Sequence, residues 1–171
     1  MKMKRLCIVL LISLFSVSAF SQTFDLSRLR AGAGPFFTSY FNSVGLNFNG
    51  VYHLDDVWEG SLGITHVFPQ DYINSTILDF DGHYIFCNAN SDLNFYALGG
   101  IGFTFYRDTY NYPNPGPGDR PRHLNETWLG LNVGAGMNLK LNDFLNLAPE
   151  VRVTIANSAY ARIGATVQYC F

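Results

Sequence analysis

Three side chains with metal-binding chemistry alternate along one segment, at Asp79, Asp81 and His83. Carboxylates and imidazoles bind Zn²⁺ and related ions. In an extended strand, alternate residues share a face about 6–7 Å apart, which is too wide for all three to reach one ion without ligands from a neighbouring strand. The segment fits either a metal site completed by neighbours or a cluster of paired charges. We favour the charge cluster and predict neither a metal nor a cofactor.

A second chemical feature is the only long irregular segment, Arg107 to Glu126, which is rich in proline and has a basic end and an aromatic base. Long exposed loops often carry binding functions. This composition suits contact with phosphate groups or with an external partner, and it suits a surface loop without a ligand equally well. The candidate binding residues in this segment are Tyr110, Tyr112, Arg120, Arg122 and His123.

The chain that must position these groups has 171 residues, of which 14% are charged, 48% hydrophobic and 16% aromatic. That composition is too apolar for a disordered protein. Its first residues have the three parts of a secretory signal peptide, and the apolar stretch is shorter than the ~20 residues of a membrane-spanning helix. We therefore predict a signal peptide at residues 1–21 and one domain at residues 22–171. The three parts are the basic Lys2, Lys4 and Arg5, the apolar Leu6–Phe20, and the cleavage site Ala19-Phe20-Ser21.

The charge and cysteine content of residues 22–171 argue against two further classes. Without the three basic residues of the signal, eight Lys and Arg stand against thirteen Asp and Glu, a net charge of −5. A nucleic-acid-binding surface is therefore not expected. Only Cys87 and Cys170 remain after the signal, too few for a disulfide-stapled domain. We expect two free thiols rather than one bridge.

Hydrophobic residues recur at every second position over most of the domain. Between Leu129 and Leu139, for example, large or small apolar residues alternate with glycine and asparagine. Seven stretches alternate in this way and a weaker one runs from Arg28 to Phe37, which gives eight strands of about 9–13 residues. Soluble strands usually have ~5–6 residues, whereas a tilted membrane-crossing strand needs ~9–11. The lengths favour strands that cross a membrane.

The two faces of these strands differ in charge. The apolar faces of the seven clear strands hold no Asp, Glu, Lys or Arg, whereas the opposite faces hold the charges and many glycines. A polar lumen inside an apolar outer band is the arrangement of membrane barrels; a soluble ligand-binding barrel such as a lipocalin has the reverse. Closure also satisfies every backbone group in lipid. We predict an all-β, eight-stranded antiparallel transmembrane β-barrel after a cleaved signal peptide.

The lumen of an eight-stranded barrel is nearly filled by side chains. Unpaired charges there are costly, so ion pairing is expected. We favour a polar plug of salt bridges that closes the barrel over a narrow gated pore or proton path built from the same charges. The residues assigned to this lumen network are Arg30, Glu59, Asp79, Asp81, His83, Glu150, Arg152 and Arg162.

Connections and aromatic residues suggest the two rims. Short turns are expected at 54–57, 87–92 and 140–143 on the side of the chain ends, and longer loops at 38–43, 69–74 and 107–126, with a short one at 156–158, on the other. Pro149 lies in the middle of the seventh strand, where a bulge or a wrong boundary is expected. Aromatic rings prefer membrane interfaces. The rim candidates are Trp58, Tyr84, Phe95, Tyr169 and Phe171 at one end and Phe37, Phe68, Phe105 and Trp128 at the other.

These features resemble the small eight-stranded outer-membrane β-barrels of the OmpA-domain, OmpX and opacity type. The most specific feature is the terminal Tyr169-Cys170-Phe171, because an aromatic last residue on an alternating final strand is what the barrel assembly machinery of that family reads. The resemblance covers residues 22–171. It implies a bacterial outer-membrane location, contact with outer-membrane lipid and lipopolysaccharide, and a C-terminal insertion signal at Tyr169 and Phe171.

Some barrels of this kind modify lipid A, so an enzyme is the second hypothesis. A lipase-like site needs a serine near a histidine and an acid that orients the histidine. The lipid A deacylase has its His and Ser two positions apart on one strand, and here none of the four histidines is followed by Ser at that spacing. We therefore expect no enzyme. The first hypothesis is a structural, adhesive or partner-binding surface protein that uses its outer loops; a soluble lipocalin-like barrel is the third.

Overall fold

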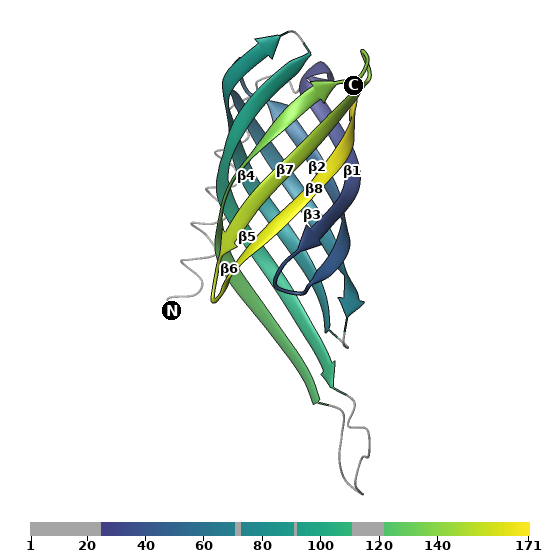
Figure 1. Ribbon diagram of the computed structural model, residues 1–171, viewed down its shortest axis with the longest axis vertical. Helices are drawn as coiled ribbons and strands as arrows, with labels where there is room; N and C mark the ends of the chain where they lie inside the picture. The colour runs from purple at the N-terminus through teal and green to yellow at the C-terminus, as the bar shows by residue number, and fades with distance from the viewer. Residues whose placement is uncertain (1–24, 71–72, 91, 111–121) are drawn as a thin grey trace, which may run out of the picture.

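The computed structural model describes residues 25–70, 73–90, 92–110 and 122–171, and in these the chain forms a closed barrel of eight antiparallel strands (Figure 1). Each strand pairs with the next, and β1 closes the barrel by pairing with β8. The strands are β1 (Leu29–Thr38), β2 (Ser43–His53), β3 (Trp58–Gln70), β4 (Ile73–Asn90), β5 (Leu93–Tyr110), β6 (Arg122–Lys140), β7 (Leu145–Ile155) and β8 (Ala159–Cys170). This confirms the predicted eight-stranded antiparallel fold.

The alternation of the sequence becomes an alternation between lumen and outer surface. On β6, Leu131 and Val133 are 60% and 57% exposed, whereas Asn132 between them is 1% exposed. The same holds on β8, whose buried and exposed residues alternate over most of its length. The large exposed residues are mostly apolar, and most of the buried residues are polar or charged. The barrel is therefore inverted relative to a water-soluble one, as a lipid surrounding requires.

The two ends of the barrel differ in the length of the strands that reach them. β4, β5 and β6 have 18, 18 and 19 residues, and the β5–β6 hairpin extends well beyond the other strands (Figure 1). The ladder between these two strands continues to the pair Tyr110 and Arg122. The prediction of an irregular segment over 107–126 is therefore wrong at both ends, where the residues belong to strands. Outside the hydrocarbon layer, two strands can stay paired without an apolar face, so the sequence there does not alternate. We call this end the hairpin end, and the opposite one, where Arg30 pairs with Cys170, the terminal end.

Two expected boundaries on other strands also change. β4 continues to Asn90 instead of turning at Cys87, because register shifts after Ile85 and after Asn88 reverse the phase of its alternation. β3 ends at Gln70 and β4 begins at Ile73, so the connection between them is shorter than the expected loop at 69–74. A bulge changes the pattern without ending the strand.

Pro149 produces no bulge. β7 pairs with β8 in one register along its whole length, including Pro149 with Ala165. The ladder to β6 is interrupted opposite Pro149 and resumes in the same register at Leu147. The expected bulge or boundary error is therefore wrong: the proline, which lacks a backbone donor, costs pairs with one neighbour only.

Short local interactions fix the terminal end. Asp25 caps the 3-10 turn η1 (Leu26–Arg28) by accepting hydrogen bonds from Ser27, and these bonds hold the pKa of the Asp25 carboxyl below its usual value.

Cys87 and Cys170 are both free, as expected. None of the described segments contains a helix long and apolar enough to cross a membrane.

Candidate functional site

The eight residues assigned to the lumen network all lie inside the barrel. Each is at most 8% exposed. They come from β1, β3, β4, β7 and β8, and they form two groups at different heights of the lumen. We call Asp79, Asp81, Glu150, Arg152 and Arg162 the central cluster, and Arg30, Glu59 and His83, together with His53, the terminal cluster.

Arg162 and Asp79 form the core of the central cluster. The Arg162 guanidinium donates to both carboxylate oxygens of Asp79, at 2.6 and 2.8 Å, in a two-point contact. Its Nη2 also donates to Thr154 Oγ1 at 3.0 Å. Asn132 Nδ2 donates to Asp79 at 2.9 Å and to Asp81 at 2.8 Å. Bidentate charge-assisted contacts of this kind are among the strongest in proteins, so this layer locks β4, β6, β7 and β8 together.

Arg152 joins the remaining carboxylates of the central cluster. Its Nη1 lies 2.6 Å from Asp81 Oδ2 and 3.4 Å from Asp79 Oδ2, and its Nε donates to Glu150 Oε1 at 2.6 Å. Tyr96 donates its hydroxyl to Glu150 Oε2 at 3.0 Å. Three carboxylates thus share two guanidinium groups, and the neutral donors of Asn132 and Tyr96 supply the remaining hydrogen bonds.

Glycines on the inward faces make room for this network. A Cβ at Gly100 would collide with Asp81, and one at Gly136 would collide with the ring of Tyr96. The glycine content of the polar faces therefore serves side-chain packing across the lumen rather than an open channel.

The terminal cluster is less completely bonded. Arg30 Nη2 donates to Glu59 Oε2 at 2.8 Å, while His53 Nε2 lies 3.1 Å from Glu59 Oε1 and His83 Nδ1 lies 3.5 Å from Glu59 Oε2. Both His contacts lack the alignment of a hydrogen bond, and among the described residues both ring nitrogens of His83 and Nε of Arg30 find no hydrogen-bond partner. His53 is also one wall of a cavity of about 660 Å³ at the terminal end, which brings water near this group.

An aromatic cluster closes the lumen at the hairpin end. Trp128 stacks on Tyr106 at 5.4 Å between ring centroids and meets Tyr40 edge-on at the same distance. Below them, Tyr160 packs with Val67 and Ile77. Trp128 lies near the rim at this end of the barrel, as predicted, but its ring packs on the lumen side with Tyr40 and Tyr106 and not in a belt that faces lipid. The signal was present in the sequence, because Trp128 shares its strand phase with the inward-facing Gly130 and Asn132.

The arrangement does not assemble a metal site from Asp79, Asp81 and His83. Both carboxylates are bonded to arginines, and the His83 ring stacks on Tyr96 at 4.4 Å. In the described part of the chain no group of three His, Cys, Asp or Glu side chains is placed to hold a metal ion.

Only some of the candidate residues outside the lumen lie in the described part of the chain. Tyr110, Arg122 and His123 belong to β5 and β6 near the far end of the hairpin, while Tyr112 and Arg120 lie outside the described residues. Tyr169 and Phe171 are 47% and 55% exposed at the terminal end, with their rings edge to face at 5.1 Å. The signal at residues 1–21 also lies outside the described residues.

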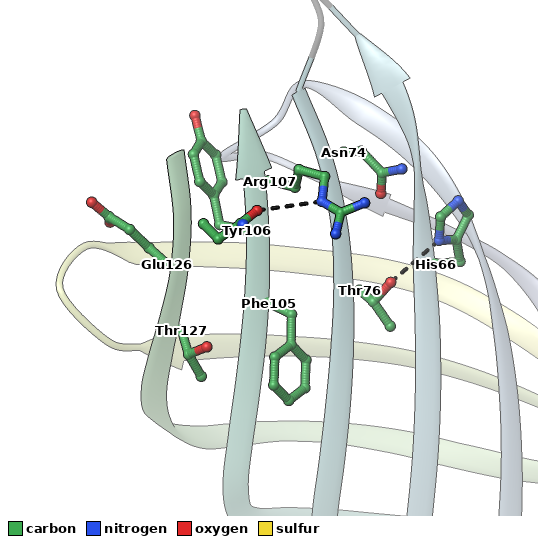
Figure 2. Close-up of a pocket in the computed structure, with 9 residues that line it drawn as sticks. His66, Asn74, Thr76, Phe105, Tyr106, Arg107, Glu126 and Thr127 are labelled. Atoms are coloured by element: carbon green, nitrogen blue, oxygen red, sulfur yellow. Dashed lines mark hydrogen bonds between the residues drawn. The ribbon is translucent and has the colours of Figure 1, made fainter. Parts of the chain in front are cut away.

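His66, toward the hairpin end of β3, does not form a catalytic triad with its described neighbours. His66 Nδ1 lies 3.3 Å from Thr76 Oγ1, and both side chains are on the outer surface (Figure 2). No ion pair joins His66 to a carboxylate among the described contacts. The pair lacks the acid that would orient the imidazole.

Comparison with solved structures shows which proteins share this fold. No family model matches the chain, and no curated protein matches it. The N-terminal β-barrel domain of Pseudomonas aeruginosa OprF superposes with a TM-score of 0.65 at 16% identity, over 83% of this chain and 97% of that domain. Neisserial surface protein A gives 0.60 at 14% identity, over 84% and 96%. Ail, the attachment invasion locus protein of Yersinia pestis, gives 0.58 at 13% identity, also over 84% and 96%.

These likenesses, at low identity, establish the fold. The chain has the architecture of the small eight-stranded outer-membrane β-barrels, with an apolar outer surface and ion-paired charges inside. The predicted class of transmembrane barrel is confirmed, and the expected outer-membrane location agrees with these structural neighbours. The third hypothesis, a soluble lipocalin-like barrel, is excluded by the direction in which the charges point.

Proposed function

We propose that the chain is a non-enzymatic outer-membrane protein that presents its β5–β6 hairpin to a partner outside the cell. One contrast carries the proposal: the lumen is filled by the central cluster and closed by aromatic rings, whereas the hairpin extends far beyond the barrel (Figure 1). A filled lumen leaves little room for solute passage. Exposed segments on a rigid scaffold are where binding usually occurs.

The same proposal assigns the two ends of the chain. Residues 1–21 act as the export signal, residues 22–171 form the barrel, and the exposed rings of Tyr169 and Phe171 serve as the insertion signal for the barrel assembly machinery. The terminal end then faces the periplasm and the hairpin end faces outward. Lipid and lipopolysaccharide surround the apolar band.

The proposed contact surface is the basic and aromatic part of the hairpin. Arginine pairs well with sulfate and phosphate groups, and Ail, one of the structural neighbours, has been crystallised with the heparin analogue sucrose octasulfate. That complex belongs to Ail, but it suggests a sulfated polysaccharide as the first probe for this chain. The contact residues are Tyr110, Tyr112, Arg120, Arg122 and His123.

The experiment removes the hairpin without opening the barrel. Arg107 and Asn125 are opposite each other on β5 and β6, so residues 108–124 can be replaced by Asn-Gly, which forms a two-residue hairpin turn. Outer-membrane fractionation and heat-modifiable gel migration show that the variant is inserted and folded. Retention on immobilised heparin is then measured for the wild type, the shortened variant and Arg28→Gln, a control that removes one exposed cation at the other end.

We expect the wild type and Arg28→Gln to be retained and the shortened variant to elute early. Equal retention of the shortened variant would remove the hairpin as the contact surface. A wild type that does not bind heparin would reject sulfated polysaccharides as the partner class.

A further inference from the structure

The outer surface changes from apolar to polar within one step along β3, β4 and β6, and one step later along β5. Across β3, β4, β5 and β6, Ile64, Leu78, Phe103 and Leu129 are register partners in one outward row. Two residues further toward the hairpin end, about 6–7 Å along each strand, the next row reads His66, Thr76, Phe105 and Thr127. Beyond it, Asn74, Arg107 and Asn125 are register partners. The edge of the hydrocarbon layer therefore lies at this step.

A cavity of about 400 Å³ lies on this step (Figure 2). Figure 2 shows the Arg107 side chain reaching from β5 toward Asn74 and Thr76, on the same side of the sheet as His66 and Phe105. Arg107 Nε donates to Asn125 Oδ1 at 3.3 Å, a contact that positions the guanidinium over the cavity. The polar lining of the cavity consists of a guanidinium, an imidazole, two hydroxyls and two amides, from Arg107, His66, Thr76, Thr127, Asn74 and Asn125. The ring of Phe105 lines the side next to the apolar row.

The one carboxylate that borders the cavity is turned toward another partner. Glu126 Oε2 accepts a hydrogen bond from Trp128 Nε1 at 2.9 Å, and in Figure 2 its side chain points away from Arg107 and His66. The remaining polar lining of the cavity therefore offers hydrogen-bond donors and one positive charge, the Arg107 guanidinium, which is held by Asn125. Guanidinium groups recognise phosphate through two parallel donors, while amides and hydroxyls suit sugar hydroxyl groups.

We propose that this cavity binds the phosphorylated sugar headgroup of an outer-leaflet glycolipid. Arg107 pairs with the phosphate, Asn74 and Thr76 bond to the sugar, and Phe105 lies against the upper part of an acyl chain. The position supports this occupant, because the cavity is lined by side chains of the outer face at the step from apolar to polar residues, where headgroups meet hydrocarbon. The inference rests on the proposed outward orientation of the hairpin end, and it concerns the barrel wall rather than the hairpin tip.

The test uses the full barrel, folded in dodecyl maltoside in phosphate-free buffer, with lipid A as the probe. Binding is followed by titration calorimetry for the wild type, Arg107→Gln and the control Arg28→Gln; heat-modifiable migration confirms that each is folded. We expect Arg107→Gln to weaken lipid A binding by about tenfold or more, as loss of a charge-assisted contact implies, and Arg28→Gln to leave it unchanged. Equal binding by Arg107→Gln and wild type would overturn the proposal.

Further arms separate the sources of the phosphate. Monophosphoryl lipid A should bind more weakly than the bisphosphorylated form, and phosphatidylglycerol, which has no sugar, should compete poorly. Inorganic phosphate that displaces lipid A at equal concentration would show a plain anion site and overturn the glycolipid assignment. The variant with residues 108–124 replaced keeps the cavity, so it should still bind lipid A even when heparin binding is lost. Loss of lipid A binding in that variant would overturn the placement of the site.

Discussion

The central and terminal clusters contain similar charges but differ in how completely these are bonded. In the central cluster, Arg162 and Arg152 both make contacts of 2.6 Å with carboxylates, and Asn132 bridges Asp79 and Asp81. In the terminal cluster, Glu59 has one aligned bond from Arg30, and both ring nitrogens of His83 find no hydrogen-bond partner among the described residues.

Distance from water explains the difference. The central cluster lies between Tyr96 on one side and the aromatic cluster on the other, so a charge left without its partner has no solvent to replace it. The terminal cluster touches a cavity through His53, which is 36% exposed on its side chain. Water there can complete the bonding that the protein leaves unfinished. The same charge pair should therefore stabilise the barrel differently at the two heights.

The largest expected effect is the loss of Arg162. Replacing it by methionine leaves Asp79 buried and deprived of its two-point partner, and breaking a buried pair in this way costs about 3–5 kcal/mol of unfolding free energy. The measurement is urea unfolding of the barrel in detergent micelles, followed by heat-modifiable migration.

A second variant tells pairing from packing. Arg162→Met combined with Asp79→Asn removes both charges, and we expect it to recover a large part of the stability lost in the single variant. If the double variant is as unstable as the single one, the Arg162 side chain acts through its volume, and the account of the central cluster as an ion-paired plug is wrong.

Glu59→Gln in the terminal cluster should cost less, about 2 kcal/mol. The amide keeps one acceptor for Arg30, and water from the adjacent cavity can solvate the guanidinium. The same urea series reports it, and the comparison with Arg162→Met is the informative quantity. A cost as large as that of Arg162→Met would mean that the cavity does not supply water to this cluster.

Strand phase made the inward-facing residues predictable, but not their partners. Alternation alone assigns Asp79 and Arg162 to the lumen, whereas their contact joins residues 83 positions apart and depends on the register of a closed barrel. The terminal cluster is a similar case: His53 follows the inward phase of β2, but only the register beside Glu59 brings it into the cluster. Register is set by turns and bulges, which the sequence pattern shows poorly.

Strand ends were harder to predict than strand interiors for a related reason. Inside lipid one face must be apolar, so the pattern is strong; beyond it that constraint disappears, and β5 and β6 continue with polar residues on both faces. The bulges after Ile85 and Asn88 likewise reverse the phase of β4. The aromatic cluster at the hairpin end was missed because Trp128 was assigned by residue type and not by phase.

The smallest expected effect concerns Tyr96, which lies between the two clusters. Its ring stacks on His83 and its hydroxyl donates to Glu150, so Tyr96→Phe removes one hydrogen bond and keeps the packing. Glu150 retains its contact with Arg152, and we expect a loss of about 1 kcal/mol in the urea series. Combining Tyr96→Phe with Glu59→Gln tests whether the clusters act independently. Additive losses mean that the ring only packs between them; a combined loss clearly different from the sum means that the stacked rings couple the two clusters into one network.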